Sequence, residues 1–252
     1  TFHYGGEWYW GVDRLHYLEQ RLQALGALRP GAAPGPIVAI PDANGAAPAR
    51  GGGDVVVDAF VSLRSPYSCI AMERLLSLPR RFPVAVRWRP VLPMVMRGLP
   101  VPLAKRLYIV RDTKREADRI GVPFGLINDP VGAPVERGFG LWRWAQAQGR
   151  GGEYLHAFLR AAFAEGVDTG SDAGLRHVVE AAGLAWSEAQ RHVDATEWRA
   201  ELEANRGAML DLGLWGVPSF RVSGGDRPPF ATWGQDRLWL VEREIAARLG
   251  AG

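Results

Sequence analysis

The sequence predicts an α/β domain whose two β-rich parts are separated by a long, all-helical insertion. Residues 55–91 show a strand, a helix and a second strand, and strand-like segments return after residue 216 before a closing helix. Residues 94–206 show helical patterns almost throughout, broken by Gly, Pro and Asp signals. A stretch of that length far exceeds an ordinary loop, so we expect it to be a folded insertion.

The first β-rich part has the pattern of a β-α-β unit. Residues 55–61 form a β-branched run of strand length, which Ser-Pro-Tyr-Ser at residues 65–68 interrupts. Apolar residues then recur at helical spacing over residues 70–78, and residues 84–91 alternate as a second strand. We expect the two strands to be parallel and joined by a right-handed crossover.

The insertion and the second β-rich part complete the domain. We assign the domain to residues 54–93 and 207–252, with the helical insertion at residues 94–206. The expected helices of the insertion cover residues 102–120, 136–148, 151–165, 171–182, 187–193 and 197–212. Residues 216–222 and 229–232 are the expected strands before the closing helix.

A short repeat precedes this domain. Trp-Gly-Val-Asp-Arg-Leu at residues 10–15, which follows a strand-like run at residues 2–4, reappears as Trp-Gly-Gln-Asp-Arg-Leu at residues 233–238. An apolar-periodic helix follows both copies. We therefore expect residues 1–28 to be the tail of a preceding, similar domain; coincidence over a short helix-start pattern is the alternative. Residues 29–53, rich in Pro, Gly and Ala, are the expected linker.

Composition excludes several classes of function. The net charge is +3, with acidic and basic residues interspersed, so we expect no nucleic-acid partner. No apolar run approaches the roughly 20 residues of a transmembrane helix, so we expect no membrane span. The five histidines are scattered and Cys69 is the only cysteine, so neither a bound metal nor an internal disulfide is expected. With no visible signal peptide and no sign of an oxidising compartment, we expect the protein in the cytoplasm.

The segment Ser65-Pro66-Tyr67-Ser68 lies where the first strand turns into the first helix. In a thioredoxin-like fold, which the order of elements predicts, that place holds Cys-x-x-Cys, because backbone N–H groups and the helix dipole stabilise a thiolate there. Serines cannot form a disulfide, but the Ser65 hydroxyl can donate a hydrogen bond to a sulfur anion that a ligand brings. The alternative is that Ser65 is only an ordinary N-cap followed by proline.

Two further segments fit a ligand site at this helix. Val217-Pro218 stands at a strand start, where a thioredoxin-like fold places a proline that faces the helix N-terminus and leaves the preceding backbone free to pair with a peptide. Gln235 and Asp236 open the last helix, where they either bind a ligand's ammonium group or only contribute favourable polarity to the first turn. The sequence therefore predicts a peptide-like thiol as ligand.

Several segments resemble the 2-hydroxychromene-2-carboxylate isomerases, which share a DsbA-like thioredoxin fold with the kappa-class glutathione transferases. Three of them occur in the family's order at residues 58–71, 216–220 and 233–238, with the sequences DAFVSLRSPYSCIA, GVPSF and WGQDRL. Residues 105–112 and 121–124 also look like part of the family's insertion. The resemblance covers the whole predicted domain.

The resemblance implies glutathione as the cofactor, with Ser65 in contact with its sulfur. The backbone of Val217, next to Pro218, is expected to pair with the tripeptide. Gln235 and Asp236 are expected to bind its γ-glutamyl end. In isomerases of this kind the glutathione thiolate is expected to add reversibly to a conjugated double bond and so allow cis–trans isomerisation.

We therefore expect a glutathione-dependent isomerase or glutathione transferase-like enzyme that acts on a small conjugated or aromatic acid. The candidate residues of the substrate pocket are Tyr67, Ser68, Arg89 and Lys105. The alternative is a redox-inactive binding module within a tandem DsbA-like protein, because the linker and the upstream copy depart from the simple enzymes. A homodimer, or pairing with the protein's own upstream domain, is the expected assembly.

Overall fold

The computed structural model describes residues 1–33, 37 and 54–250. The chain divides into two compact units, residues 1–45 and 46–252. Most of the linker predicted at residues 29–53 lies outside the described residues. Within the described ranges, no helix has the length and apolar character needed to cross a lipid bilayer.

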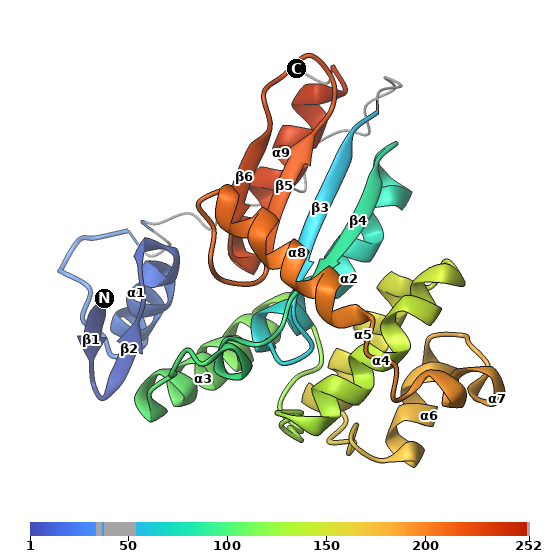
Figure 1. Cartoon of the computed structure of the whole chain (residues 1–252). Helices are drawn as coiled ribbons and strands as arrows, with labels where there is room; N and C mark the ends of the chain where they lie inside the picture. Colours follow the sequence, from blue (N-terminus) through green and yellow to red (C-terminus); the bar gives the residue numbers. More distant parts are fainter. Residues whose placement is uncertain (34–36, 38–53, 251–252) are drawn as a thin grey trace. The chain divides into compact units, whose positions relative to one another are not determined.

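The first unit is a β-hairpin followed by a helix (Figure 1). β1 (Phe2–Tyr4) and β2 (Glu7–Tyr9) pair antiparallel. Gly5 and Gly6 join them with φ values of 57° and 81°, the positive values that a two-residue type I′ turn requires. Of these two strands, only β1 was predicted from the sequence.

The repeated hexapeptide adopts the same local structure in both copies. The two copies form a 3₁₀ turn and a helix: η1 (Val12–Arg14) with α1 (Leu15–Ala24), and η4 (Gln235–Arg237) with α9 (Leu238–Arg248). The glycine before each turn has a positive φ, 79° at Gly11 and 105° at Gly234. This agreement favours two related structural units, and a complete preceding domain stays a prediction.

The second unit is built on a four-stranded sheet in the order β4-β3-β5-β6 (Figure 1). Its strands are β3 (Val56–Val61), β4 (Ala85–Pro90), β5 (Ser219–Ser223) and β6 (Phe230–Trp233). β3 and β4 run parallel and are joined by α2 (Pro66–Arg81), whereas β5 pairs antiparallel with both β3 and β6. This topology confirms the predicted α/β, thioredoxin-like fold.

Helices cover both faces of the sheet. Ala59 of β3 points to one face and joins a core with α2 and α9. Phe60, the next residue, points to the other face and packs with Met209 of α8 (Trp198–Asp211). Because α8 packs on the sheet, the predicted end of the insertion at residue 206 falls within a helix of the domain's own core.

The insertion lies between β4 and α8 and packs against the sheet domain. It consists of η2 (Met94–Arg97), α3 (Leu103–Ile120), α4 (Ala133–Ala147), α5 (Gly151–Phe163), α6 (Asp172–Ala181), α7 (Trp186–Ala189) and η3 (Gln190–His192). One hydrophobic core runs from α5 through α2 to the sheet. Gly152 permits a close approach of α5 to β4, because a Cβ at Gly152 would lie 2.7 Å from the Trp88 ring.

A buried carboxylate links three strands of the sheet, β3, β4 and β5. Asp58 is fully buried on the same face of β3 as Phe60. Its carboxylate accepts hydrogen bonds at 2.5, 3.1 and 2.7 Å from Arg87, Arg89 and Arg221. Burial by itself would raise the pKa of Asp58, but these hydrogen bonds outweigh it and hold the pKa below its ordinary value. The network links β3 to its two neighbours in the sheet.

Candidate functional site

Ser65 is the N-cap of α2. Its backbone is extended, with φ −108° and ψ 111°, and its Oγ accepts a hydrogen bond from the Ser68 N–H at 3.1 Å. Pro66 follows in the first turn, where no intrahelical N–H partner is needed. The side chain of Ser65 is only half-buried. The partial positive charge of the helix end therefore lies at a hydroxyl that a ligand can reach.

The Ser65 hydroxyl also faces the loop that precedes β5. Its Oγ donates to the Val217 carbonyl at 3.4 Å, which is long for such a bond. The Val217–Pro218 peptide bond is cis. Among the described residues, the Val217 N–H donates to no backbone carbonyl. The loop therefore offers a backbone donor next to a hydroxyl whose hydrogen can turn towards a ligand.

One face of α3 holds two residues that border this loop and helix end. Asp112 and Glu116 are about one helical turn apart, and both are almost completely buried. Asp112 accepts a hydrogen bond from the Tyr67 hydroxyl at 2.7 Å. Glu116 accepts one from the Gln235 side-chain amide, also at 2.7 Å. α3 thereby fixes the orientation of Tyr67, two residues after Ser65, and of Gln235 at the start of the last helix.

Gln235 and Asp236 lie at the end of β6. Gln235 is 6% exposed, and because its amide nitrogen is bonded to Glu116, its amide oxygen is the group left to accept a hydrogen bond from a ligand. Asp236 follows in the same 3₁₀ turn, and a side chain at Gly234 would collide with its carboxylate. The Gly234 N–H donates to the Pro218 carbonyl at 3.0 Å, which ties this turn to the cis-proline loop.

Ser68 does not belong to this group, which corrects its expected place in a substrate pocket, whereas the same prediction for Arg89 stays a prediction. Ser68 is completely buried, and its Oγ accepts a hydrogen bond from the Ser62 N–H, so it faces the protein interior. Arg89 donates to Asp58 and to Asn205 of α8. The buried Asp58 carboxylate requires cationic partners, and Arg89 is one of them.

The Cys69 side chain is buried in this fold. Its side chain is 3% exposed, and its Sγ lies 3.6 Å from the Leu159 carbonyl oxygen. Burial is the main reason why the pKa of its thiol is raised to about 12. Since the thiolate is the reactive form of a cysteine, burial disfavours Cys69 as a sulfur nucleophile beside Ser65.

Arg64 holds the loop that leads into α2, a role that the sequence did not indicate. Its guanidinium forms a two-point ion pair with Asp129, and both nitrogen–oxygen distances are 2.6 Å. Asp129 lies in the segment before α4. The ion pair therefore fixes the residue immediately before Ser65 to the helical insertion.

Lys105 lies beside Trp215, which contacts Trp233, and the sequence assigned neither tryptophan to the site. The ring centroids of Trp215 and Trp233 are 5.8 Å apart. The Lys105 ammonium lies 5.6 Å from the Trp215 ring centroid. Only Trp233 carried a signal in the sequence, as the first residue of the repeated hexapeptide.

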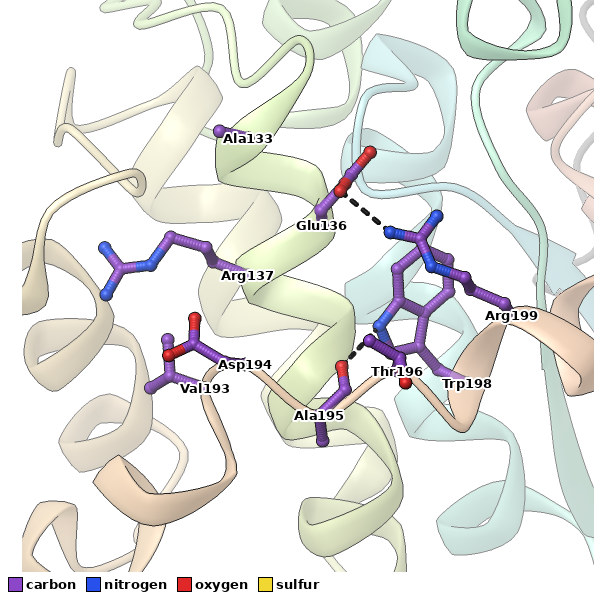
Figure 2. A pocket seen from close by; sticks show the side chains of 9 residues that line it. All are labelled: Ala133, Glu136, Arg137, Val193, Asp194, Ala195, Thr196, Trp198 and Arg199. Carbon is purple, nitrogen blue, oxygen red and sulfur yellow. Dashed lines mark hydrogen bonds and ion pairs between the residues drawn. The ribbon is translucent and has the colours of Figure 1, made fainter.

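A separate cavity of about 150 Å³ lies in the helical insertion, between α4 and the segment that leads into α8 (Figure 2). Arg199 donates to the Glu136 carboxylate at 2.9 Å, and the Trp198 indole N–H donates to the Ala195 carbonyl at 2.9 Å. These polar groups therefore already pair with one another. None of the residues around Ser65 lines this cavity, so it is not part of the candidate site.

Comparisons with known proteins agree on the fold. Residues 56–246 match the family described as DSBA-like thioredoxin domain. A solved structure of 2-hydroxychromene-2-carboxylate isomerase is 20% identical, with a TM-score of 0.61 over 76% of this chain and 95% of that one. The cytosolic disulfide reductase DsbM from Pseudomonas aeruginosa is 22% identical, with a TM-score of 0.60 over 77% and 99%. The same reductase solved with GSH is 20% identical, with a TM-score of 0.57 over 77% and 97%.

A search of curated proteins found no match. At 20–22% identity the similar structures establish the fold rather than a reaction. The match to the family covers residues 56–246, which include all four strands of the sheet and the whole insertion. The chain therefore belongs to the DSBA-like thioredoxin domain family.

Proposed function

We propose that this domain binds glutathione beside Ser65 and acts as a glutathione-dependent isomerase or transferase on a small conjugated or aromatic acid. The observation that carries the proposal is the approach of Ser65 to Val217, where a half-buried capping hydroxyl lies 3.4 Å from the carbonyl before the cis-proline. The helix end favours an anion, yet the domain supplies no thiolate there, because Cys69 is buried.

The residues around Ser65 fit a tripeptide that carries a free thiol. At the sulfur, the Ser65 hydroxyl and the N-terminus of α2 are donors to an anion. Along the peptide, the Val217 N–H is placed to pair with an extended backbone, as an added strand does. At the γ-glutamyl end, the Gln235 amide oxygen and the Asp236 carboxylate are acceptors for an ammonium group. Donors and acceptors thus match glutathione at three separate points.

The energies at Ser65 are large enough to ionise a bound thiol. A favourable charge at a helix end contributes about 0.3–1 kcal/mol, and a hydrogen bond to a charged group contributes about 1.5–3 kcal/mol. Since one pKa unit corresponds to about 1.4 kcal/mol, together they lower the pKa of the bound thiol by about one to three units. A thiol whose pKa in solution is roughly 8.5 then forms thiolate near neutral pH.

Each residue of the site has a separate task in the proposed reaction. When bound, glutathione supplies a thiolate that adds reversibly to a conjugated double bond, permits rotation about the resulting single bond and is eliminated again, with no net oxidation. Ser65 and the α2 N-terminus hold the sulfur as an anion. Val217 and Gln235 fix the tripeptide, and Tyr67, whose hydroxyl is bonded to Asp112, forms a fixed wall beside Ser65.

Two of the similar structures support the choice of ligand and reaction. One is a 2-hydroxychromene-2-carboxylate isomerase, and the reductase DsbM has been solved with GSH. Disulfide exchange through a cysteine pair is not open to this domain, because Cys69 is the only cysteine in the sequence. The thiolate of a bound cofactor is the sulfur nucleophile that remains.

Calorimetric titration with glutathione and with S-methylglutathione tests the proposal. We expect glutathione to bind with a micromolar to millimolar Kd and S-methylglutathione to bind about tenfold more weakly, because a methylated sulfur carries no charge for Ser65 to stabilise. Absence of glutathione binding would contradict the proposal. Equal binding of both ligands would instead favour the alternative, a redox-inactive binding module.

A further inference from the structure

Three arginines surround the buried Asp58 carboxylate on one face of the sheet. Asp58 lies opposite Arg87 in the pairing of β3 with β4, and opposite Arg221 in the pairing of β3 with β5. Arg89 is two residues after Arg87 and therefore lies on the same face of β4. All three guanidinium groups donate hydrogen bonds to Asp58. The sheet thus holds guanidinium groups on both sides of a single carboxylate.

The charges of this arginine cluster (Arg87, Arg89 and Arg221) do not balance. Within the described ranges, Asp58 is the only carboxylate that forms an ion pair with any of the three arginines. Three charges of +1 and one of −1 give the group a net charge of +2. The shared carboxylate holds the guanidinium groups close together, so the excess positive charges repel each other. An anionic ligand would relieve this repulsion.

Part of each guanidinium remains open to solvent. The side chains of Arg87, Arg89 and Arg221 are 48%, 31% and 30% exposed, although Asp58 itself is completely buried. Arg87 and Arg221 both contact Asp58 through Nε and Nη2. In the part of the chain that the structure describes, the Nη1 atoms of these two arginines donate to no protein group. Each arginine therefore has donors left for a ligand.

The arginine cluster borders α8 and is separate from the candidate glutathione site. Met209 of α8 packs on Phe60, near the end of β3, and Arg89 donates to Asn205 of α8 at 3.3 Å. Figure 1 shows α8 crossing the sheet near these strand ends, while the beginnings of β3 and β4 extend past it. Asp58 lies towards the beginning of β3, whereas the N-cap of α2 follows the end of that strand.

We propose that Arg87, Arg89 and Arg221 form a binding site for a dianionic phosphate group. A guanidinium is planar and pairs with two phosphate oxygens at once, which makes arginine a suitable partner for phosphate. A phosphate monoester carries a charge of about −1.5 to −2 near neutral pH, close to the excess charge of the cluster. The ligand is either free phosphate or a small organic monoester. This site does not depend on the proposed glutathione reaction.

The cluster favours a phosphate monoester over a carboxylate or a phosphate diester. A carboxylate has one charge and two oxygens, so it cannot engage arginines on both sides of Asp58 equally well. A diester also carries only one charge. A monoester has three terminal acceptor oxygens, enough for the Nη1 atoms of Arg87 and Arg221 and for Arg89.

Calorimetric titration with methyl phosphate, dimethyl phosphate and inorganic phosphate, at constant ionic strength, tests this inference. We expect methyl phosphate to bind with a submillimolar to millimolar Kd and dimethyl phosphate to bind about tenfold more weakly, because it carries a single charge. Inorganic phosphate that binds as tightly as methyl phosphate identifies free phosphate as the ligand, and weaker binding identifies an organic monoester; both results agree with the site. Absence of methyl phosphate binding, or equal binding of dimethyl phosphate, overturns the inference.

Variants of Arg87 test whether the arginine cluster holds the ligand. Arg87→Gln should raise the Kd for methyl phosphate about fivefold to tenfold. Arg87→Lys, which keeps the charge but loses the planar fork, should have an intermediate effect. Arg160→Gln is the matched control, because Arg160 is 46% exposed, pairs with Glu165 and changes the net charge equally. Unchanged binding in Arg87→Gln, or the same loss in Arg160→Gln, contradicts the proposed site.

Two further measurements separate a lost site from a damaged fold. Circular dichroism checks that each variant is folded, and Arg221→Gln, on the other side of Asp58, should weaken methyl phosphate binding as Arg87→Gln does. Glutathione binding should be the same in wild type and in Arg87→Gln, because the cluster lies away from the α2 N-terminus. A variant that loses methyl phosphate and glutathione binding together would show general damage to the domain and would overturn the inference.

Discussion

The side-chain amide of Gln235 and the carboxylate of Glu116 are 119 positions apart in the sequence and are joined by a hydrogen bond of 2.7 Å. The bond connects the turn before α9 to α3, and both side chains are buried. Because the amide nitrogen is held by Glu116, the amide oxygen has one fixed direction. Glu116 is therefore a positioning residue for the proposed γ-glutamyl contact.

Replacing Glu116 tests this positioning role. In Glu116→Ala the Gln235 amide loses its partner and can rotate, so we expect the Kd for glutathione to rise about threefold to tenfold. The pKa of the bound thiol should not change, because Ser65 is untouched. Calorimetry measures the first quantity and the ultraviolet absorbance of the thiolate the second. Asp118→Ala is the control, since Asp118 lies on the same helix, is 62% exposed and pairs with Lys114.

Local features of the site were predictable because they depend on neighbours in the sequence. The Ser65 cap, the first-turn Pro66 and the turn at Gln235 follow from residue types at fixed offsets. The insertion helices followed from their apolar periodicity, and α3 begins at Leu103, one residue from its predicted start. The α/β, thioredoxin-like fold was thus predictable from the order of the helices and strands along the chain.

Contacts between distant segments were not predictable, because periodicity carries no information on pairing across the fold. The bond between Glu116 and Gln235 is one example. Arg89 is another: nothing local shows that Asp58, on the neighbouring strand, would be buried and would require it. Ser68 looked equivalent to Ser65 in the motif, but it lies on the inner side of the first turn of α2 and is buried.

Cys69 should be inert towards thiol reagents in the folded protein. Burial raises the pKa of its thiol to about 12. Almost no thiolate therefore exists near neutral pH. We expect iodoacetamide to leave the native protein unlabelled and to label it fully in denaturant, as mass spectrometry can show. Rapid labelling of the native protein would mean that the chain has its own nucleophile and does not need a borrowed one.

The Asp58 network should make the fold sensitive to acid. Since hydrogen bonds from three arginines hold the pKa of Asp58 below its ordinary value, its stabilisation is present above about pH 4 and is lost as the pH falls through the folded-state pKa. Asp58→Asn should lower the free energy of unfolding by about 2–3 kcal/mol at pH 7, and the difference from wild type should shrink on acidification.

Urea denaturation at neutral pH and at about pH 3 measures both effects. Glu242, which is also buried and has a lowered pKa through Arg74 and Arg81, keeps part of the acid sensitivity in the variant. Glu203→Gln is the surface control and should have little effect at either pH. An Asp58→Asn protein as stable as wild type at neutral pH is the outcome that rules out this role.

Ser171 has the same capping geometry as Ser65, so it serves as a control that separates the capping role of Ser65 from its proposed role at a bound thiol. Ser171 caps α6 and accepts a hydrogen bond from the Gly174 N–H at 3.0 Å, as Ser65 accepts one from Ser68 at 3.1 Å. Replacing either serine by alanine should reduce stability by about 0.5–2 kcal/mol. Only Ser65→Ala should change the ionisation of a bound thiol.

The most direct measurement is therefore the pKa of the glutathione thiol bound to the wild-type protein, followed by the ultraviolet absorbance of the thiolate as the pH is varied. We expect a value about one to three units below that of the free thiol, raised again by about one unit or more in Ser65→Ala and unchanged in Ser171→Ala. A thiol that titrates in the wild-type complex as it does in solution would contradict the proposed role of Ser65 and of the α2 N-terminus.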